Sequence, residues 1–499
     1  MKKTMLLLSS SVLAGCAVGV DYKTPKTHTP DAFSEAHGGP TTQPVAQVDL
    51  SRWWLTFKDP ELESLIKRAV DSNLDLQLAE ARVRQARAQL GVEQGGFWPT
   101  VDVDASATKA QVSRTTNSGG TIAATGQQTN SSFSTNRRGE LYQAGFDANW
   151  ELDVFGGQRR AIESASATLE SQVDARRNVL VSLTAEVARN YINLRGLQRQ
   201  LALTFSNLKT QQDTLELTRS RFKAGLTSDL DVARAQAQVA TTAAQVPTQE
   251  VQIKQTMHRI AILLGQEPET LAAELGKEQP IPPTPTEIPV GLPSELLRRR
   301  PDVRQAERNL AAATADIGVS VSELFPKFSL TGQLGQRSGR AGLMTVADST
   351  YWSIGPTVQW RIFDAGQLIN NVRVSNAIQQ QTLIQYKQTV LQSLSDVEDA
   401  MVSYSQDQNR LRALTEAVAA NQRAVDLSNQ LYTRGLGDFL NVLDAERNLF
   451  AAQNDMAVSE TAVATDLVQL YKALGGGWNE ETEDQFRKRE DPAQKVVLE

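Results

Sequence analysis

Hydrophobic residues recur every seven positions along two long stretches of the chain. In the first stretch they are Val173, Leu180, Val187, Leu194, Leu201, Leu208, Leu215 and Phe222. In the second, each lies 210 residues further on: Leu383, Val390, Val397, Tyr404, Leu411, Val418, Val425 and Tyr432. A seven-residue period keeps one face of a helix apolar over many turns, and such a face needs partner helices. The pattern therefore predicts two long, laterally packed helices in an internally duplicated chain.

Prolines and glycines set the limits of these helices. Residues 157–224 and 367–434 contain no proline, and each range covers 68 residues. At 1.5 Å per residue, each helix would be roughly 100 Å long. Gly225 and Gly435 follow, and glycine suits the left-handed conformation at a helix end, so we expect the chain to turn there. Shorter helices are predicted over residues 61–93, 228–264, 301–324 and 438–474.

Four further stretches alternate between apolar and polar residues, two in each copy. Val101 and Val103, for example, alternate with Asp102 and Asp104. The predicted strands cover residues 101–108, 142–154, 327–334 and 352–362, with loops over 120–143 and 335–350. Strands of this kind are typical of a barrel with lipid outside and water inside. An amphipathic sheet in a soluble protein would explain the alternation equally well.

The N-terminus carries a targeting signal. Lys2 and Lys3 precede an apolar run that ends in Leu13-Ala-Gly-Cys16, so residues 1–15 are predicted to be a signal peptide. The last four residues resemble the lipobox of bacterial lipoproteins, in which the cysteine is acylated. This resemblance implies a lipid on Cys16, and Ala17 after it implies sorting to the outer membrane. The alternative is an ordinary signal peptide followed by a buried cysteine.

Composition narrows the classes of function. A formal net charge of -6 gives no indication of the basic surface that binds nucleic acid. Three histidines and one cysteine leave little for a transition-metal site. No nucleophile and base pair stands out in the sequence. We therefore expect no enzyme activity, no metal and no cofactor apart from the lipid on Cys16.

The predicted organisation follows the duplication. Residues 279–293 contain six prolines and form a rigid linker between the copies. The first hairpin is longer, because Pro99 and Trp150 are 51 residues apart whereas Pro326 and Trp360 are 34 apart. The predicted divisions are the signal peptide 1–15, a lipid-anchored segment 16–60, the first repeat 61–278, the linker 279–293, the second repeat 294–478 and a charged tail 479–499.

Several segments together resemble the outer-membrane efflux factors, the TolC-like family, in its NodT lipoprotein branch. They are Cys16, the Trp53-Trp54…Phe57…Asp59-Pro60 segment, Trp150-Glu-Leu-Asp-Val-Phe-Gly156 and Leu292-Pro-Ser-Glu-Leu-Leu-Arg-Arg-Arg-Pro-Asp-Val-Arg304. The resemblance implies a mixed α+β, mainly α fold and a homotrimer. Four strands are too few to close a barrel, whereas three chains supply twelve. The twelve-stranded transmembrane β-barrel would continue into a periplasmic α-helical barrel.

The resemblance also implies partners and a gate. The partners are a periplasmic adaptor and an inner-membrane pump of the resistance-nodulation-division type. The gate would lie at the turns, with Tyr432, Asn441 and Asp444 on the second and Asp231 near the first. Arg434 is a candidate for a pair across the turns. Three copies of Asp444 would form a carboxylate ring that attracts cations, and protonation would relieve their repulsion.

Simpler interpretations of these residues remain open. Asp444 can be a solvated charge beyond a turn, and the heptad position of Tyr432 explains it as a packing residue. The predicted function is an outer-membrane exit duct for small toxic compounds or antibiotics. The alternatives are a duct for a secreted polypeptide and a coiled-coil envelope lipoprotein without a pore.

Overall fold

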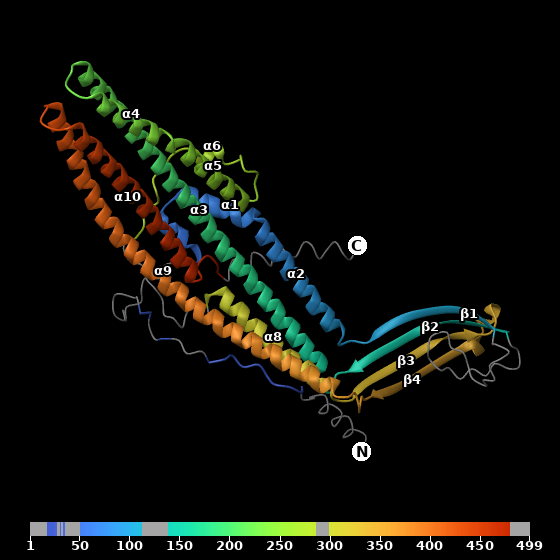
Figure 1. Cartoon of the computed structure of the whole chain (residues 1–499). Helices are drawn as coiled ribbons and strands as arrows, with labels where there is room; N and C mark the ends of the chain where they lie inside the picture. The colour runs from blue at the N-terminus through green and yellow to red at the C-terminus, as the bar shows by residue number, and fades with distance from the viewer. Residues whose placement is uncertain are drawn as a thin grey trace. The chain divides into compact units, whose positions relative to one another are not determined.

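The computed structural model describes residues 17–26, 30, 33–34, 50–111, 138–285 and 299–479 (Figure 1). These residues form two compact units. The first contains residues 85–169 and 308–384 together with the N-terminal segment to Thr24, and the second contains the remainder. Cys16, the signal peptide and the tail beyond residue 479 lie outside the described residues.

Two very long helices dominate the chain, as the heptads predict. Helix α3 covers Gly157–Lys223 and helix α9 covers Gln367–Thr433, each with 67 residues. Gly225 and Gly435 follow them with φ angles of 71° and 75°. The amides of Leu226 and Leu436 donate to carbonyl oxygens five residues back, at 2.9 Å in both cases. Both helices therefore end in the same glycine-based turn.

Two of the predicted shorter helices are interrupted. Residues 228–264 form α4 (Asp229–Ala243) and α5 (Gln245–Leu263) instead of one helix. Pro247 lies in the first turn of α5, and because proline has no amide hydrogen it cannot continue the hydrogen bonds of α4. Residues 61–93 form α1 (Pro60–Ser72) and α2 (Leu74–Gly95), separated by Asn73 in an extended conformation.

The remaining helices agree more closely with the prediction. Helix α8 covers Pro301–Ser322, and α10 runs without a break over Phe439–Ala473. A 3-10 helix, η1 (Leu50–Phe57), and the short α6 (Ala272–Leu275) complete the second unit. Among the described helices, none combines the length and apolarity needed to cross a membrane.

All four predicted strands are present in one antiparallel sheet. They are β1 (Thr100–Gln111), β2 (Arg138–Leu152), β3 (Lys327–Ser338) and β4 (Thr350–Gln359), in the order β1-β2-β3-β4. Strands β2 and β3 join the two copies, for example through the pair Trp150 and Leu330. The loop predictions were too long, since residues 138–143 and 335–338 lie in strands. The short turns η2 (Ala341–Leu343) and η3 (Ala347–Ser349) connect β3 to β4.

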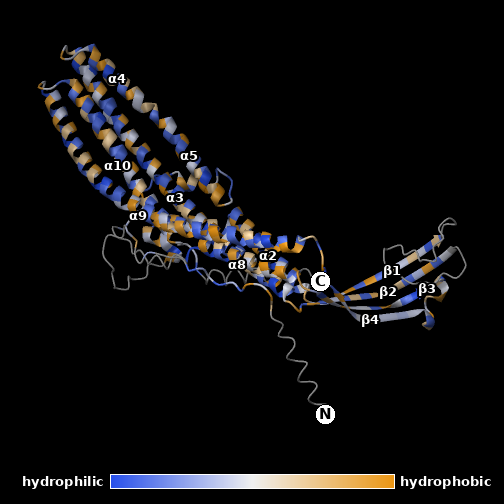
Figure 2. Ribbon diagram, turned by 60° about the horizontal axis from the view of Figure 1, so that its bottom comes forward, coloured by the Kyte–Doolittle hydropathy of each residue, from blue (hydrophilic) through white to orange (hydrophobic). Residues whose placement is uncertain are grey.

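Hydrophobic and hydrophilic residues both occur along the strands (Figure 2), and the register of the sheet places them in separate rows. One row across all four strands is Val103, Phe146, Leu334 and Trp352. These four residues are 70%, 56%, 55% and 73% exposed. The adjacent row, on the opposite face, is Asp102, Asp147, Gln333 and Ser353. The isolated chain therefore exposes an apolar sheet face, which marks a surface for an apolar environment.

The core of the second unit includes the segment with two adjacent tryptophans. Trp53 is buried and stacks on Tyr471 of α10, with ring centroids 5.3 Å apart. Asp59 caps α1 by accepting hydrogen bonds from the Glu61 and Leu62 amides. The Tyr191 hydroxyl of α3 donates to the other carboxylate oxygen of Asp59 at 2.7 Å. These contacts attach α1 to the long helices.

Candidate functional site at the helix tips

The two glycine turns lie at the same end of the second unit (Figure 1). We call residues 214–238 the first tip and residues 424–448, which lie 210 positions later, the second tip. An apolar cluster joins them; its buried members are Leu215, Ala235, Tyr432, Phe439, Val442 and Leu443. Because helices α3, α4, α9 and α10 all contribute to this junction, the position of one tip depends on the other.

Tyr432 packs within this cluster. It is 3% exposed, and its ring lies 5.8 Å from that of Phe439. The Arg221 guanidinium of the first tip lies 4.6 Å from the centre of the tyrosine ring, a cation–π contact. The Tyr432 hydroxyl is buried and has no hydrogen-bond partner among the described residues. In the single chain, Tyr432 joins the tips as a packing residue, and its role in a gate stays a prediction.

Asp231 is engaged within the first tip. It forms a capping box with Ser228, the residue that precedes α4. Its carboxylate accepts hydrogen bonds from the hydroxyls of Thr227 and Ser228 at 2.7 and 2.8 Å. Partial burial opposes ionisation, but these hydroxyls, the Ser228 amide and Arg234 together hold the pKa of Asp231 below its usual range. Asp231 is therefore an ionised cap at the start of α4.

Asp444 and Asn441 face solvent instead. Both side chains are exposed on the first turns of α10, and so is Arg434 just after α9. The side-chain amide of Asn448 donates to the Asp444 carboxylate at 3.3 Å, and both residues belong to α10. Among the described residues, no hydrogen bond or ion pair links Asp444 or Arg434 to the first tip. The structure therefore does not bring these three residues together with Asp231.

Three polar contacts between the tips were not predicted from the sequence. The Arg221 guanidinium of α3 donates to the Thr433 carbonyl of α9 at 3.4 Å. The Thr214 hydroxyl of α3 donates to Glu446 Oε1 of α10 at 2.8 Å. The Arg447 guanidinium of α10 donates to Gln238 Oε1 of α4 at 2.8 Å. The spacing of Phe439, Val442 and Glu446 offered one signal, because it places a carboxyl group on the apolar stripe of α10.

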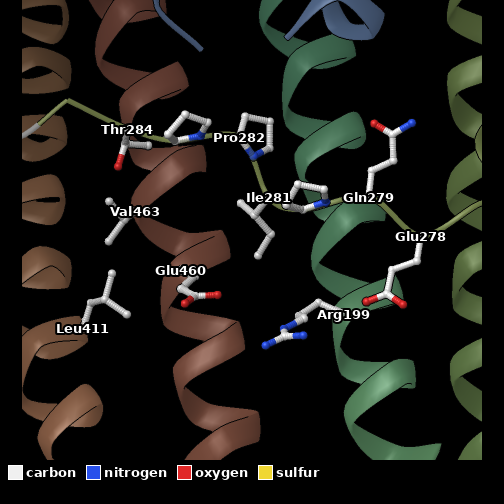
Figure 3. A pocket seen from close by; sticks show the side chains of 11 residues that line it. Arg199, Glu278, Gln279, Ile281, Pro282, Thr284, Leu411, Glu460 and Val463 are labelled. Atoms are coloured by element: carbon white, nitrogen blue, oxygen red, sulfur yellow. The ribbon is translucent and has the colours of Figure 1, made fainter. Parts of the chain in front are cut away.

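A cavity lies away from the tips, beneath the described part of the linker (Figure 3). Its volume is about 620 Å³, and Ile281 and Pro282 of the linker overhang it. Arg199 and Glu460 lie on the neighbouring helices α3 and α10. Burial raises the pKa of Glu460, and Arg199 opposes this change.

The Tyr404 hydroxyl donates to the Pro285 carbonyl, so the linker is attached to α9. The described residues contain no group of three or more side chains able to hold a metal ion.

Comparison with known proteins identifies the family of this chain. The model for "Outer membrane efflux protein" matches residues 65–266 and 292–476. "Nodulation protein T" of Rhizobium leguminosarum bv. trifolii is 32% identical over 470 residues, covering 94% of this chain and 96% of that protein. The toluene efflux pump outer membrane protein TtgC of Pseudomonas putida is 31% identical over 492 residues, with 97% of each chain covered.

Solved structures agree with this result. The outer-membrane channel OprN superimposes with a TM-score of 0.83 at 37% sequence identity. The alignment covers 93% of this chain and 100% of the channel. The family model and the relatives together span both copies, both tips and all four strands. The chain belongs to the outer membrane efflux protein family.

Proposed function

We propose that this chain is the outer-membrane exit channel of a tripartite efflux pump that exports small toxic compounds or antibiotics. It works with a periplasmic adaptor and an inner-membrane pump. The observation that carries the proposal is a sheet with an exposed apolar face in the same chain as two 67-residue helices. The relative named for toluene efflux supports a small, apolar class of exported compound. This function requires neither a catalytic residue nor a cofactor.

The channel is a homotrimer with a twelve-stranded barrel and a helical tunnel. Strands β1 and β4 form the two edges of the described sheet. An edge strand presents unpaired backbone groups, and pairing β4 of one copy with β1 of the next would satisfy them. Four strands cannot close a barrel, but twelve can. Exposed apolar residues on α9, such as Ile384 and Leu391 at 65% and 68%, support contact with a neighbouring copy.

A lipid on Cys16 anchors the chain at the outer membrane, with the helices in the periplasm. The residues just after Cys16 are attached close to the end of strand β2. The Val18 amide donates to the Phe155 carbonyl at 3.0 Å. Arg160, which is buried, donates to Asp21 at 2.6 Å. These contacts support an anchor point near the membrane end of α3.

The gate lies at the tips, where Gly225 and Gly435 meet the adaptor. Asp444 and Asn441 on α10 are exposed and available to line a constriction, with Arg434 beside the turn. Three copies of Asp444 would concentrate negative charge there and favour cations. Tyr432 and Asp231 contribute by holding the tips in place, through the apolar cluster and the cap of α4.

Two measurements test the function. Deleting the gene is expected to increase susceptibility to dyes, detergents and antibiotics. Unchanged susceptibility together with the loss of a secreted protein would favour a polypeptide duct instead. The purified protein and its Asp444→Ala variant are both expected to conduct ions across a planar bilayer. Absence of conductance from both proteins would favour an envelope lipoprotein without a pore.

A further inference from the structure

We infer that Glu446 is a positioning residue of the gate, whose protonated carboxyl group holds the second tip against Thr214 of the first. This inference rests on the proposed channel function. It adds a residue that neither lines the constriction nor touches the exported compound. Glu446 lies on α10 only two residues after Asp444, so a shift of its helix moves the exposed face that carries Asp444.

The geometry gives Glu446 one neutral partner in an enclosed position. Its side chain is 4% exposed and lies next to the apolar cluster that joins the tips. The Thr214 hydroxyl of α3 donates to its Oε1 atom at 2.8 Å. An ionised carboxylate in such surroundings is costly unless cations or several donors compensate the charge. The single Thr214 hydroxyl does not compensate a full negative charge, so the neutral, protonated acid is the form of Glu446 that fits this position.

The charged groups on the helices around Glu446 do not compensate it. On α10, Arg447 donates to Gln238 and the Asp444 side chain is exposed. On α4, Arg234 lies 3.8 Å from Asp231. On α3, Arg221 lies over the Tyr432 ring.

Other charged residues on neighbouring turns of α3 and α9 are exposed to solvent. Asp213 and Glu216 of α3 are exposed, as are Arg423 and Asp426 of α9. Burial raises the pKa of Glu446 and the Thr214 hydroxyl lowers it, with the net effect upward. No cation contributes to this balance, which agrees with the absence of an ion pair at Glu446 among the described residues.

The duplication shows that this arrangement belongs to the second copy alone. The position 210 residues before Glu446 is Gln236, which is exposed and accepts a hydrogen bond from Arg219 at 3.4 Å. The first copy thus has a neutral residue in water where the second has a buried acid. A proton-sensitive contact is therefore built into the second tip only.

The sign of the pH effect follows from the raised pKa. We assign the packed tips, with Glu446 against Thr214, to the closed arrangement of the gate. In it Glu446 holds its proton more tightly than an exposed glutamate, whose ordinary pKa is 4.5. The closed arrangement is therefore fully stabilised below that value and loses stability as the pH rises through the raised pKa. Ionisation draws Glu446 toward water, which separates α10 from α3 and favours opening.

The test is the single-channel conductance of the purified full-length protein across a pH series. The open probability of the wild type is expected to rise with pH. Glu446→Gln should remain closed and lose this pH response, because glutamine keeps a hydrogen-bonding side chain without titrating. The matched control is Glu216→Gln, an exposed glutamate of the first tip, which should keep the wild-type response.

A second variant covers the case in which Glu446→Gln does not assemble. Thr214→Val removes the hydroxyl but keeps the size of the side chain, and should raise the open probability at low pH, where the wild type is held closed. A wild-type pH response in Glu446→Gln, or an unchanged open probability in Thr214→Val, would overturn the inference. A conducting wild type without any pH response would overturn it too. Failure of every protein to conduct would contradict the proposed channel function instead.

Discussion

The two tips share a turn but differ in how the following helix is capped. After Gly225, the side chains of Ser228 and Asp231 form a reciprocal capping box at the start of α4. After Gly435, the corresponding residues are Asp438 and Asn441, and Asp438 makes no side-chain hydrogen bond to α10. The glycines therefore determine the path of the chain in both tips, whereas the polar residues that follow stabilise only the first.

The second tip depends correspondingly more on contacts with its neighbour. Tyr432 is held by Arg221, and Glu446 by Thr214, so both contacts reach across to the first tip. A cap of the kind in the first tip contributes about 1 kcal/mol. The first tip is thus stabilised by its own cap, whereas the second is held mainly by its contacts with the first.

The largest expected effect comes from removing the side chain that joins the tips. Tyr432→Ala would leave a cavity in the apolar cluster and destabilise the second tip by on the order of 3 kcal/mol. Hydrogen exchange of the α9 and α10 amides measures this local opening. The matched control is Phe222→Ala, 210 residues earlier, since Phe222 is 43% exposed and its loss should cost little. Equal losses of protection in the two variants would refute the asymmetry between the tips.

A smaller and symmetric effect is expected at the glycines. No atom lies within 4 Å of a Cβ added at Gly225 or Gly435, so a substitution there costs only backbone strain. Alanine in the left-handed region should destabilise each turn by about 1–2 kcal/mol. Hydrogen exchange should show similar losses for Gly225→Ala and Gly435→Ala. A loss confined to one tip would show that the two turns are not equivalent.

Substitutions of the residues that precede α4 and α10 should again affect the two tips differently. Ser228→Ala is expected to destabilise the start of α4 by about 1 kcal/mol, whereas Asp438→Ala should leave α10 almost unchanged. Amide exchange over the first turn of each helix gives the comparison. A large effect of Asp438→Ala would mean that the second tip is capped after all.

The cap also carries a pH dependence. The pKa of Asp231 is depressed below 3.8, so its ionised carboxylate stabilises the first tip at any pH above that value. This stabilisation is lost as the pH falls through the depressed pKa. Asp231→Asn should thus weaken the first tip at neutral pH and have no further effect once Asp231 is protonated.

The smallest expected effect concerns ion preference. Asp444→Asn removes the carboxylate of the proposed ring without changing side-chain size, so the channel should favour cations less strongly. Reversal potentials in a salt gradient measure this preference. The control is Asp229→Asn at the start of α4, outside the proposed ring, which should leave the reversal potential unchanged. Identical potentials for Asp444→Asn and the wild type would place Asp444 outside the constriction.

Much of the fold could be predicted from the sequence because its signals are local. The heptads and Gly225 and Gly435 predicted both long helices to within one residue. The break between α4 and α5 was missed although Pro247 marks it, since the apolar pattern continues across the proline. The predicted limits of the loops were also wrong. Arg337 and its neighbours are polar and were assigned to a loop, but they belong to β3, a strand with one polar face.

The candidate site was harder to predict, because it depends on which helix faces meet. Nothing in the order of residues places Thr214 against Glu446, which are separated by 232 positions and come from different copies. The burial of Tyr432 follows from its heptad position, but its contact with Arg221 does not. The capping role of Asp231 was readable from Ser228, since a serine three residues before an acid is a known start of a helix.

The pairing of β2 with β3 also constrains the order of folding. Leu152 and Phe328 are direct neighbours in the sheet, yet the chain between them contains α3, α4, α5, α6 and α8. Closing so long a loop is entropically costly, and contacts between distant residues form slowly. The hairpin β1–β2 therefore emerges well before β3 exists to pair with it. During secretion its apolar face and open edge are exposed, and protection by a chaperone at that stage would prevent aggregation.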